Sequence, residues 1–314
     1  MNPDLNRRLL LAAGALCLAA GVLLVATQLW PSGSSLSTGA IDDMVELAAE
    51  AGTDDSADPD AASLAADDDF PAIEDSAIRD ADERAEPRAG TITVLDTIPH
   101  DTGAFTQGFE FDGDRLFEST GLIGQSTLRE LDPATGAVLR SIPVDDVFAE
   151  GLTIVGDEAI QLTWTEGVAF RYDVDTFELL ATHTYEGQGW GICDEGDVLR
   201  MSDGTPTLQT RDVETFELLD TVEVTFNGAL VERINELECV AGSVWANIWQ
   251  TPLIIEIDPD TGVVRTVLDG SELRPESTVD DSGAVLNGIA YDPASGTWLL
   301  TGKRWPLAYR VTIE

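Results

Sequence analysis

A carboxylate, two carboxamides and an ammonium group stand in short phrases that lie far apart in the sequence. Glu150 lies in Phe-Ala-Glu-Gly, Gln107 in Phe-Thr-Gln-Gly, Asn235 in Ile-Asn-Glu-Leu, and Lys303, the only lysine of the chain, in Gly-Lys-Arg-Trp. A carboxylate withdrawn from water can take up and return a proton near neutral pH. Amide and ammonium groups can donate hydrogen bonds to an oxygen that gains negative charge. Brought together, these groups could catalyse proton transfer at a carbonyl group.

Aromatic residues accompany these polar groups. Phe105 and Phe148 stand two residues before the glutamine and the glutamate, and Trp164, Trp190 and Trp249 end or begin neighbouring apolar runs. Apolar rings with a few convergent polar groups are typical of small-ligand pockets. Any one of these rings could instead fill the space between packed sheets, but packing alone does not require an acid and a lysine in the same set.

Metal-binding residue types are scarce. The chain has two histidines and three cysteines, with no Cys-x-x-Cys phrase, which leaves little from which to build a zinc site, and we expect no metal ion in the site. Cys17 lies in an apolar N-terminal run. Cys193 and Cys239 could form a disulfide in an oxidising compartment or remain two buried thiols.

The elements that must position these groups are β-strands. From residue 90 onward, short β-branched and aromatic runs alternate with Asp-Gly, Thr-Gly and Gly-Asp turns, which is an all-β pattern. One phrase recurs with its aspartate at Asp132, Asp173, Asp212 and Asp258, in steps of 41, 39 and 46 residues. A period near 40 with about four strands is typical of a β-propeller blade.

The repeat predicts five blades. Four complete blades of four strands begin with strands at 105–111, 149–155, 189–195 and 235–241. Three further strands follow at 287–292, 297–303 and 307–314. Residues 91–98 supply the missing fourth strand, so that the N-terminal strand pairs with the C-terminal blade and closes the ring without free edges.

This layout gathers the polar and aromatic residues at one rim. The first strand of each blade runs along the central channel and the second returns beside it, so first-strand starts and second-strand ends share a rim. The residues named above occupy such positions, as does the phrase Leu286-Asn287-Gly. We expect structural roles for three other acids and no chemical role for either histidine: Glu118, Glu236, Glu238, His100 and His183.

The charge of the chain limits its partners. It carries 58 acidic and 17 basic residues, a formal charge of −41, and residues 89–314 alone hold 40 acids against 12 bases. Such a surface repels phosphate backbones. We therefore expect no nucleic-acid partner.

The N-terminal part differs from the rest. Arg7 and Arg8 precede an apolar run from Leu9 to Trp30, which is long enough for the roughly 20 residues of a membrane span. The arginines place the N-terminus in the cytoplasm and the rest outside. We expect residues 1–30 to be a transmembrane anchor or signal-anchor, with secretion if it is cleaved. Residues 31–89 form an acidic linker expected to be disordered, and residues 90–314 form the propeller.

These phrases, in this order, resemble the plant-type glutaminyl cyclases and their bacterial relatives, the five-bladed glutamine cyclotransferases, over nearly all of residues 92–314. The matching phrases include Phe105-Thr-Gln-Gly, Phe148-Ala-Glu-Gly, Gly189-Trp-Gly, Asn235-Glu-Leu-Glu and Gly302-Lys-Arg-Trp. The resemblance implies a glutaminyl-peptide cyclotransferase, an acyltransferase that converts N-terminal glutamine of peptides and proteins to pyroglutamate and releases ammonia. Ala149 stands where the family usually has glycine.

The resemblance also implies roles for individual residues. Glu150 matches the family's general acid/base, and the substrate contacts match Phe105, Gln107, Phe148, Trp164, Trp190, Asn235, Trp249 and Lys303. No cofactor is implied for catalysis, although some members carry a structural calcium in the channel, whose ligands we do not identify here. We expect a monomer that meets peptide or protein substrates with N-terminal glutamine and contacts the membrane through its N-terminal helix.

Two other functions fit a propeller of this kind. A non-catalytic propeller could bind a peptide or glycan at the cell surface, but the chain retains Glu150. A propeller lactonase would need a calcium-bound cluster of Glu, Asn and Asp in the channel, and the tryptophan-rich mouth argues against it. Ammonia release from a peptide with N-terminal glutamine, with and without a chelator, distinguishes the three.

Overall fold

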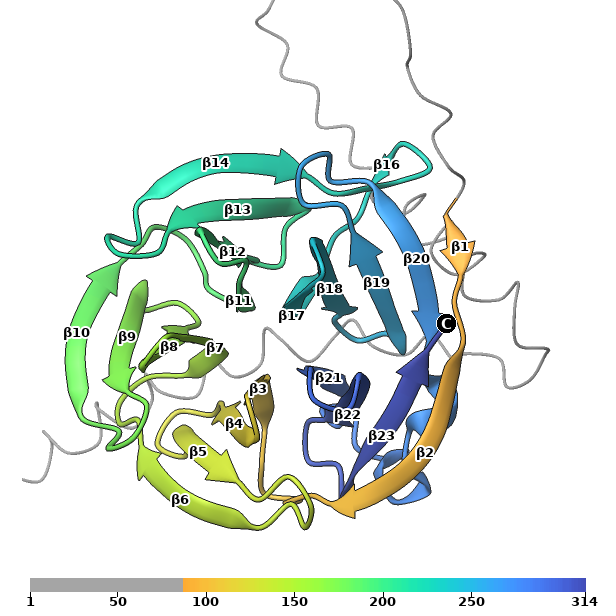
Figure 1. The fold of residues 1–314 in the computed structure, drawn as a ribbon, viewed down its shortest axis with the longest axis horizontal. Helices are drawn as coiled ribbons and strands as arrows, with labels where there is room; N and C mark the ends of the chain where they lie inside the picture. The colour runs from red at the N-terminus through yellow and green to blue at the C-terminus, as the bar shows by residue number, and fades with distance from the viewer. Residues whose placement is uncertain (1–86) are drawn as a thin grey trace, which may run out of the picture. The chain divides into compact units, whose positions relative to one another are not determined.

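A computed structural model of the protein describes residues 87–314, which form a ring of five sheets, each built on four antiparallel strands (Figure 1). In each sheet the strands follow one another from the centre of the ring to its edge. The predicted five-bladed β-propeller is confirmed.

The first two blades agree with the predicted strands to within a few residues. Blade 1 contains β3 (Thr106–Asp112), β4 (Arg115–Thr120), β5 (Thr127–Leu131) and β6 (Val138–Pro143). Blade 2 contains β7 (Ala149–Val155), β8 (Glu158–Thr163), β9 (Val168–Asp173) and β10 (Leu179–Thr184).

Blade 3 has a shorter inner strand than expected. It contains β11 (Ile192–Asp194), β12 (Val198–Met201), β13 (Thr207–Asp212) and β14 (Leu218–Glu223). Ahead of β11, the Trp190 carbonyl accepts a hydrogen bond from Gly151 N of blade 2 at 2.7 Å, while Trp190 N donates to Ser202 O of blade 3 at 3.0 Å. The backbone before β11 is thus shared between two blades.

Blades 4 and 5 complete the ring. Blade 4 contains β17 (Ile234–Val240), β18 (Ser243–Ile248), β19 (Leu253–Ile257) and β20 (Val264–Asp269). Blade 5 contains β21 (Leu286–Asp292), β22 (Thr297–Gly302), β23 (Leu307–Ile313) and, outermost, β2 (Ile92–Pro99). Because β2 runs antiparallel to β23 along its whole length, the predicted closure by the N-terminal strand is confirmed (Figure 1).

Several small elements were not predicted. β1 (Arg88–Ala89) pairs in parallel with β20, so the strand structure begins inside the segment assigned to the linker. The open edge of β20 offers free backbone groups, which explains why a short strand forms here. A hairpin of β15 (Thr225–Phe226) and β16 (Ala229–Leu230) joins blades 3 and 4, and two 3₁₀ turns, η2 (Ser271–Leu273) and η3 (Glu276–Thr278), lie between blades 4 and 5.

The core lies between the blades. Inner strands are covered on both faces, so that six of the seven residues of β7 are buried, whereas the outermost strand β14 is exposed at most positions. A disulfide between Cys193 on β11 and Cys239 on β17 links blades 3 and 4, with 5.4 Å between the two Cα atoms. The sequence alone did not decide between this disulfide and two buried thiols.

Arginines tie neighbouring blades together at the rim where first strands end. Each guanidinium donates to the carbonyl that follows the repeated aspartate of another blade: Arg115 to Val174 O (3.0 Å), Arg171 to Val213 O (2.6 Å), Arg200 to Pro259 O (3.2 Å) and Arg310 to Pro133 O (3.3 Å). Hydrogen bonds from charged donors are stronger than neutral ones. Four of the few basic residues in this acidic chain thus connect neighbouring blades.

Within residues 87–314, no helix is both long enough and apolar enough to cross a bilayer. The anchor expected at residues 1–30 and nearly all of the expected linker lie outside the described residues.

Candidate active site

A recurring irregularity positions the polar groups at the start of the inner strands. The register shifts between Thr106 and Gly108 in β3, between Ala149 and Leu152 in β7, between Ile234 and Leu237 in β17, and between Leu286 and Ile289 in β21. The shifted residues include Gln107, Glu150, Asn235 and Asn287, one from each of four blades. Bulges re-aim side chains and occur beside active sites. Here the bulges place four polar residues at the same end of the inner strands.

Gln107 joins the two charged groups of this cluster. Its Nε2 donates to Glu150 Oε1 at 2.9 Å, and its Oε1 accepts from Lys303 Nζ at 2.6 Å. Asn287 Nδ2 approaches the same oxygen at 3.4 Å and donates to Thr106 O at 2.9 Å. An amide has one acceptor and one donor end, so Gln107 can hold a carboxylate on one side and an ammonium on the other.

Glu150 is a buried acid, 5% exposed, in an environment that favours its neutral form. Burial raises the pKa of its carboxyl well above the usual range, and the charge of Glu166 adds to the rise, whereas Lys303 opposes it. The Glu150 backbone is held by Ser119, whose Oγ donates to Glu150 O. A carboxyl with a raised pKa can both take and give a proton near neutral pH.

Lys303 follows the last residue of β22 and is 3% exposed. Burial lowers the pKa of its ammonium to about 8, against the opposing charges of Glu150 and Glu236. Its Nζ lies 4.8 Å from the centre of the Phe105 ring, within the range of a cation–π contact. Of the three protons of its ammonium, one is donated to Gln107. Lys303 therefore has further donor capacity toward a ligand.

Some buried amide atoms near this cluster have no partner in the part of the chain that the structure describes. Among them are Asn235 Oδ1, Asn247 Nδ2 and Asn287 Oδ1. A buried polar atom without a partner costs free energy unless a ligand or water satisfies it. Asn235 and Asn287 lie in the bulges beside the carboxylate and lysine, so the cluster has the unsatisfied groups that a polar ligand would fill.

Aromatic rings form one side of the mouth. Phe148 lies edge-on to Phe105 at 6.0 Å and to Trp164 at 5.7 Å, measured between ring centres, and Trp190 lies edge-on to Trp249 at 5.4 Å. Trp164 is 40% exposed, which is unusual for so large an apolar residue. These rings contribute to an apolar surface beside the buried carboxylate.

The structure thus brings the predicted residues to one rim. Glu150, Gln107 and Lys303 form a bonded chain, Phe105 contacts the lysine, and Asn235 occupies a bulge. The remaining predicted rings, Phe148, Trp164, Trp190 and Trp249, form the pairs described above. The sequence pattern places Asn287 at the rim without indicating a role for it, and it does not single out Gln188. The position of Gln188 beside Gly189-Trp190 was the only signal available.

His100 and Glu118 have a structural role that the sequence revealed only in part. His100 is 8% exposed; its Nε2 lies 3.0 Å from Glu118 Oε1 and its Nδ1 lies 2.8 Å from Trp305 O. Thr106 Oγ1 donates to the same Glu118 oxygen at 2.7 Å. This network joins the closing strand to blade 1 and to the segment after Lys303. His183, as expected, lies on an outer strand, where it stacks on Phe216.

Two acids of the inner strands, Glu236 and Glu238, accept hydrogen bonds from backbone N–H groups of neighbouring blades. Glu236 accepts from Phe109 N (3.2 Å) and Ile289 N (2.9 Å), and Glu238 accepts from Tyr291 N (3.1 Å). Within residues 87–314, no three His, Cys, Asp or Glu side chains form a group that could hold a metal ion. Glu236 and Glu238 thus hold backbone N–H groups of blades 1 and 5, which agrees with the structural role expected of them.

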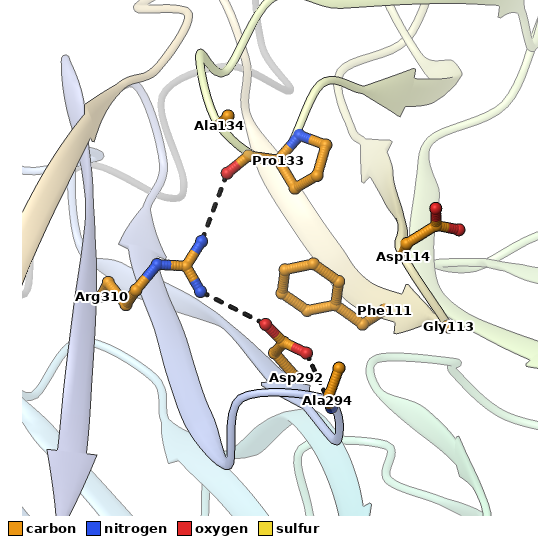
Figure 2. Close-up of a pocket in the computed structure, with 8 residues that line it drawn as sticks. All are labelled: Phe111, Gly113, Asp114, Pro133, Ala134, Asp292, Ala294 and Arg310. Carbon is orange, nitrogen blue, oxygen red and sulfur yellow. Dashed lines mark hydrogen bonds and ion pairs between the residues drawn. The ribbon is translucent and has the colours of Figure 1, made fainter.

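A separate hollow of about 220 Å³ lies between blades 5 and 1 at the opposite rim (Figure 2). Phe111 forms its wall, and Arg310 bridges Pro133 O at 3.3 Å and Asp292 Oδ2 at 3.5 Å (Figure 2). Its arginine is thus engaged in one of the ties between blades. This hollow is distant from Glu150 along the channel, so we assign it no part in the chemistry.

Comparison with known proteins agrees with the geometry. Residues 70–313 match the family model described as glutamine cyclotransferase. A glutaminyl-peptide cyclotransferase of Arabidopsis thaliana is 37% identical over 235 residues, which is 72% of each chain. The crystal structure of Myxococcus xanthus glutaminyl cyclase is 39% identical with a TM-score of 0.67, and the match covers 73% of this chain and 99% of that one. The chain therefore belongs to the glutamine cyclotransferase family.

Proposed function

We propose that this protein cyclises the N-terminal glutamine of peptides and proteins to pyroglutamate, with Glu150 as the acid–base group. The observation that carries the proposal is the bonded chain from Glu150 through Gln107 to Lys303 at the mouth of the propeller. The family to which the chain belongs supports the reaction class.

The reaction needs one proton to move between two nitrogens. The substrate's α-amine attacks its own side-chain carbonyl carbon, forming a C–N bond and a tetrahedral intermediate with a negatively charged oxygen. Glu150, as the carboxylate, takes a proton from the attacking nitrogen and delivers it to the side-chain nitrogen. The bond from carbon to that nitrogen then breaks, and ammonia leaves. One carboxyl serves both steps and returns to its starting state.

The hydrogen-bond pattern supports different roles for Gln107 and Lys303. Gln107 uses its amide nitrogen on Glu150 and its oxygen on Lys303, so it holds both groups in place. Lys303 keeps further N–H donors beyond the one given to Gln107, and it carries a positive charge when protonated. It is therefore the better donor to the charged oxygen of the intermediate.

The aromatic wall contributes orientation and low polarity. Rings at the rim limit the access of water to Glu150, and this burial is the main cause of its raised pKa. A substrate held against the indoles would keep its amine close to its own carbonyl, and such orientation can lower a barrier substantially. The proposal requires no metal ion or organic cofactor in the chemical step.

The cellular setting remains part of the proposal. We propose that residues 1–30 anchor the enzyme in a membrane, that the acidic linker tethers it, and that the propeller acts as a monomer outside the cytoplasm. The apolar run after two arginines and the acid-rich composition of residues 41–88, with 17 acids and 3 arginines, support this arrangement. Membrane fractionation of the full chain and of a chain lacking residues 1–30 tests the anchor.

The activity is tested with a dipeptide that carries N-terminal glutamine. We expect ammonia release together with a product whose mass is lower by one ammonia, equally with and without a chelator. Binding of the peptide without ammonia release would support the non-catalytic propeller instead. Chelator-sensitive hydrolysis of a lactone would support the lactonase.

A further inference from the structure

Two tryptophans of the rim share one hydrogen-bond acceptor. Gln188 Oε1 lies 2.7 Å from Trp164 Nε1 and 2.9 Å from Trp190 Nε1. Trp164 follows the end of β8 in blade 2, whereas Trp190 precedes β11 in blade 3. A single amide oxygen therefore connects indoles that belong to different blades.

The chemistry of these groups fixes the orientation of the amide. An indole N–H can only donate, and an amide oxygen has two lone pairs with which to accept. The Gln188 oxygen must therefore face both indoles, and its nitrogen must point away from them. Both indole N–H groups are engaged within the protein, which leaves the ring surfaces as the parts of Trp164 and Trp190 that can meet a ligand.

Gln188 also joins two aromatic pairs into one arc. Trp164 packs on Phe148, and Trp190 packs on Trp249, but no ring contact connects the first pair to the second within the described residues. The Gln188 amide connects the two pairs, because its oxygen accepts from one tryptophan of each pair.

The backbone around Gln188 is held closely. Gly189 N donates to Trp164 O at 3.0 Å, and a Cβ built on Gly189 would lie 2.3 Å from the Tyr185 hydroxyl and 2.9 Å from Thr163 O. A side chain at position 189 would collide with both. The segment therefore has little freedom to move, and the Gln188 amide is presented to the indoles from a fixed point.

We propose that Gln188 is a positioning residue that sets substrate affinity by holding Trp164 and Trp190 as one surface for the N-terminal residue of the peptide. The proposal rests on the proposed function for the identity of the substrate. Gln188 acts through the indoles and takes no part in proton transfer. Its loss should therefore raise KM much more than it lowers kcat, and it should leave the pH profile of kcat unchanged.

The test compares three variants of the full chain. Gln188→Met keeps the length of the side chain but removes the acceptor, and Gln188→Glu keeps an oxygen acceptor. Gln125→Met is the matched control, because Gln125 is an exposed glutamine of the same rim, in the β4–β5 connection. We expect Gln188→Met to raise KM for the dipeptide by about 10-fold, which corresponds to ~1.4 kcal/mol, with kcat within about 2-fold. We expect Gln188→Glu and Gln125→Met to stay near the parent protein.

A second readout does not depend on activity. The chain has seven tryptophans, so ¹⁵N labelling of the indoles gives a small set of N–H signals. Two of these signals should lose their hydrogen-bonded shifts in Gln188→Met and keep them in Gln188→Glu. If the parent protein releases no ammonia, the proposed function fails. The indole signals would still show whether Gln188 accepts hydrogen bonds from Trp164 and Trp190. Unchanged signals and KM in Gln188→Met, or an equal defect in Gln188→Glu, would overturn the inference.

Discussion

Lys303 donates to Gln107 across 2.6 Å, although 196 residues separate them in the sequence. Gln107 opens the inner strand of blade 1 and Lys303 follows the second strand of blade 5, so closure of the ring between the first and last blades brings them together. The site therefore forms where blade 1 meets blade 5, at the point of ring closure. Strand β2 pairs with β23 and completes the blade that carries Lys303.

Gln107 should be required for activity because it orients two groups at once. In Gln107→Met, Glu150 loses a donor and Lys303 loses an acceptor, while the volume of the side chain changes little. We expect kcat/KM for the dipeptide to fall by roughly 10²-fold, on the scale of a lost positioned group. Steady-state ammonia release checks this, and a variant within about 3-fold of the parent would show that the bonded chain is dispensable.

Lys303 should limit activity at alkaline pH. Its pKa is lowered to about 8, so its charge is lost as the pH rises through that value. We expect kcat to decline above about pH 8. Lys303→Arg keeps its charge over this range because arginine remains protonated, so any activity it retains should lack the decline. Lys303→Met should lower kcat by about 10²-fold or more below about pH 8, and its difference from the parent should shrink above that pH. If kcat of the parent protein keeps rising above about pH 9, this role of Lys303 is contradicted.

The channel acids should make the fold less stable in alkali. Burial raises the pKa of Glu110 to about 8, with smaller additions from Asp194 and Asp112, against the hydrogen bond that Ile154 N donates to it at 3.1 Å. Because the folded pKa exceeds the ordinary value of 4.5, the folded protein binds this proton more tightly. The stabilisation is complete below the ordinary value and is lost as pH rises through the folded one.

Denaturant unfolding between about pH 5 and pH 9 tests this effect. The free energy of unfolding should fall with pH, and Glu110→Gln should make the fall shallower by up to ~1.4 kcal/mol per pH unit. Glu217→Gln, at an exposed turn of blade 3, removes the same formal charge and is the control. Identical pH dependence in the two variants would show that Glu110 is not the source. Glu236 and Glu238, whose pKa values burial also raises, should account for part of the remaining slope.

The disulfide should stabilise the ring between blades 3 and 4. Cys193 and Cys239 are 46 residues apart, and closing a loop of that size contributes ~4 kcal/mol in the chain-entropy model. The double variant Cys193→Ala/Cys239→Ala should therefore unfold at lower denaturant concentration than the parent. Reduction of the parent should give a similar loss. Equal midpoints for oxidised and reduced parent protein would contradict the prediction.

The blades could be predicted from the sequence because one local interaction repeats. The aspartates at 132, 173, 212 and 258 each accept backbone N–H groups of the turn that follows, so the same residue types are required in each blade. The site residues could be placed on one rim because strand direction alternates regularly.

Other features depended on contacts that no local pattern encodes. Gln188 lies in an exposed connection, and its role follows only from two indoles on neighbouring blades. The pairing of His100 with Glu118 likewise depends on how the closing strand meets blade 1. The short strand β1 contains only Arg88 and Ala89, whose types give no strand signal.

The most direct test of the account is the replacement of Glu150 by glutamine. Glu150→Gln keeps the size of the side chain and can still bond to Gln107, but it cannot take up a proton. Glu217→Gln removes an exposed acid from a turn of blade 3 that has no part in the site, and it is the control. With both variants showing the parent's unfolding transition, we expect kcat for ammonia release from the dipeptide to fall at least ~10²-fold in Glu150→Gln. Turnover near the parent value in folded Glu150→Gln would contradict the central claim that this carboxylate carries the proton.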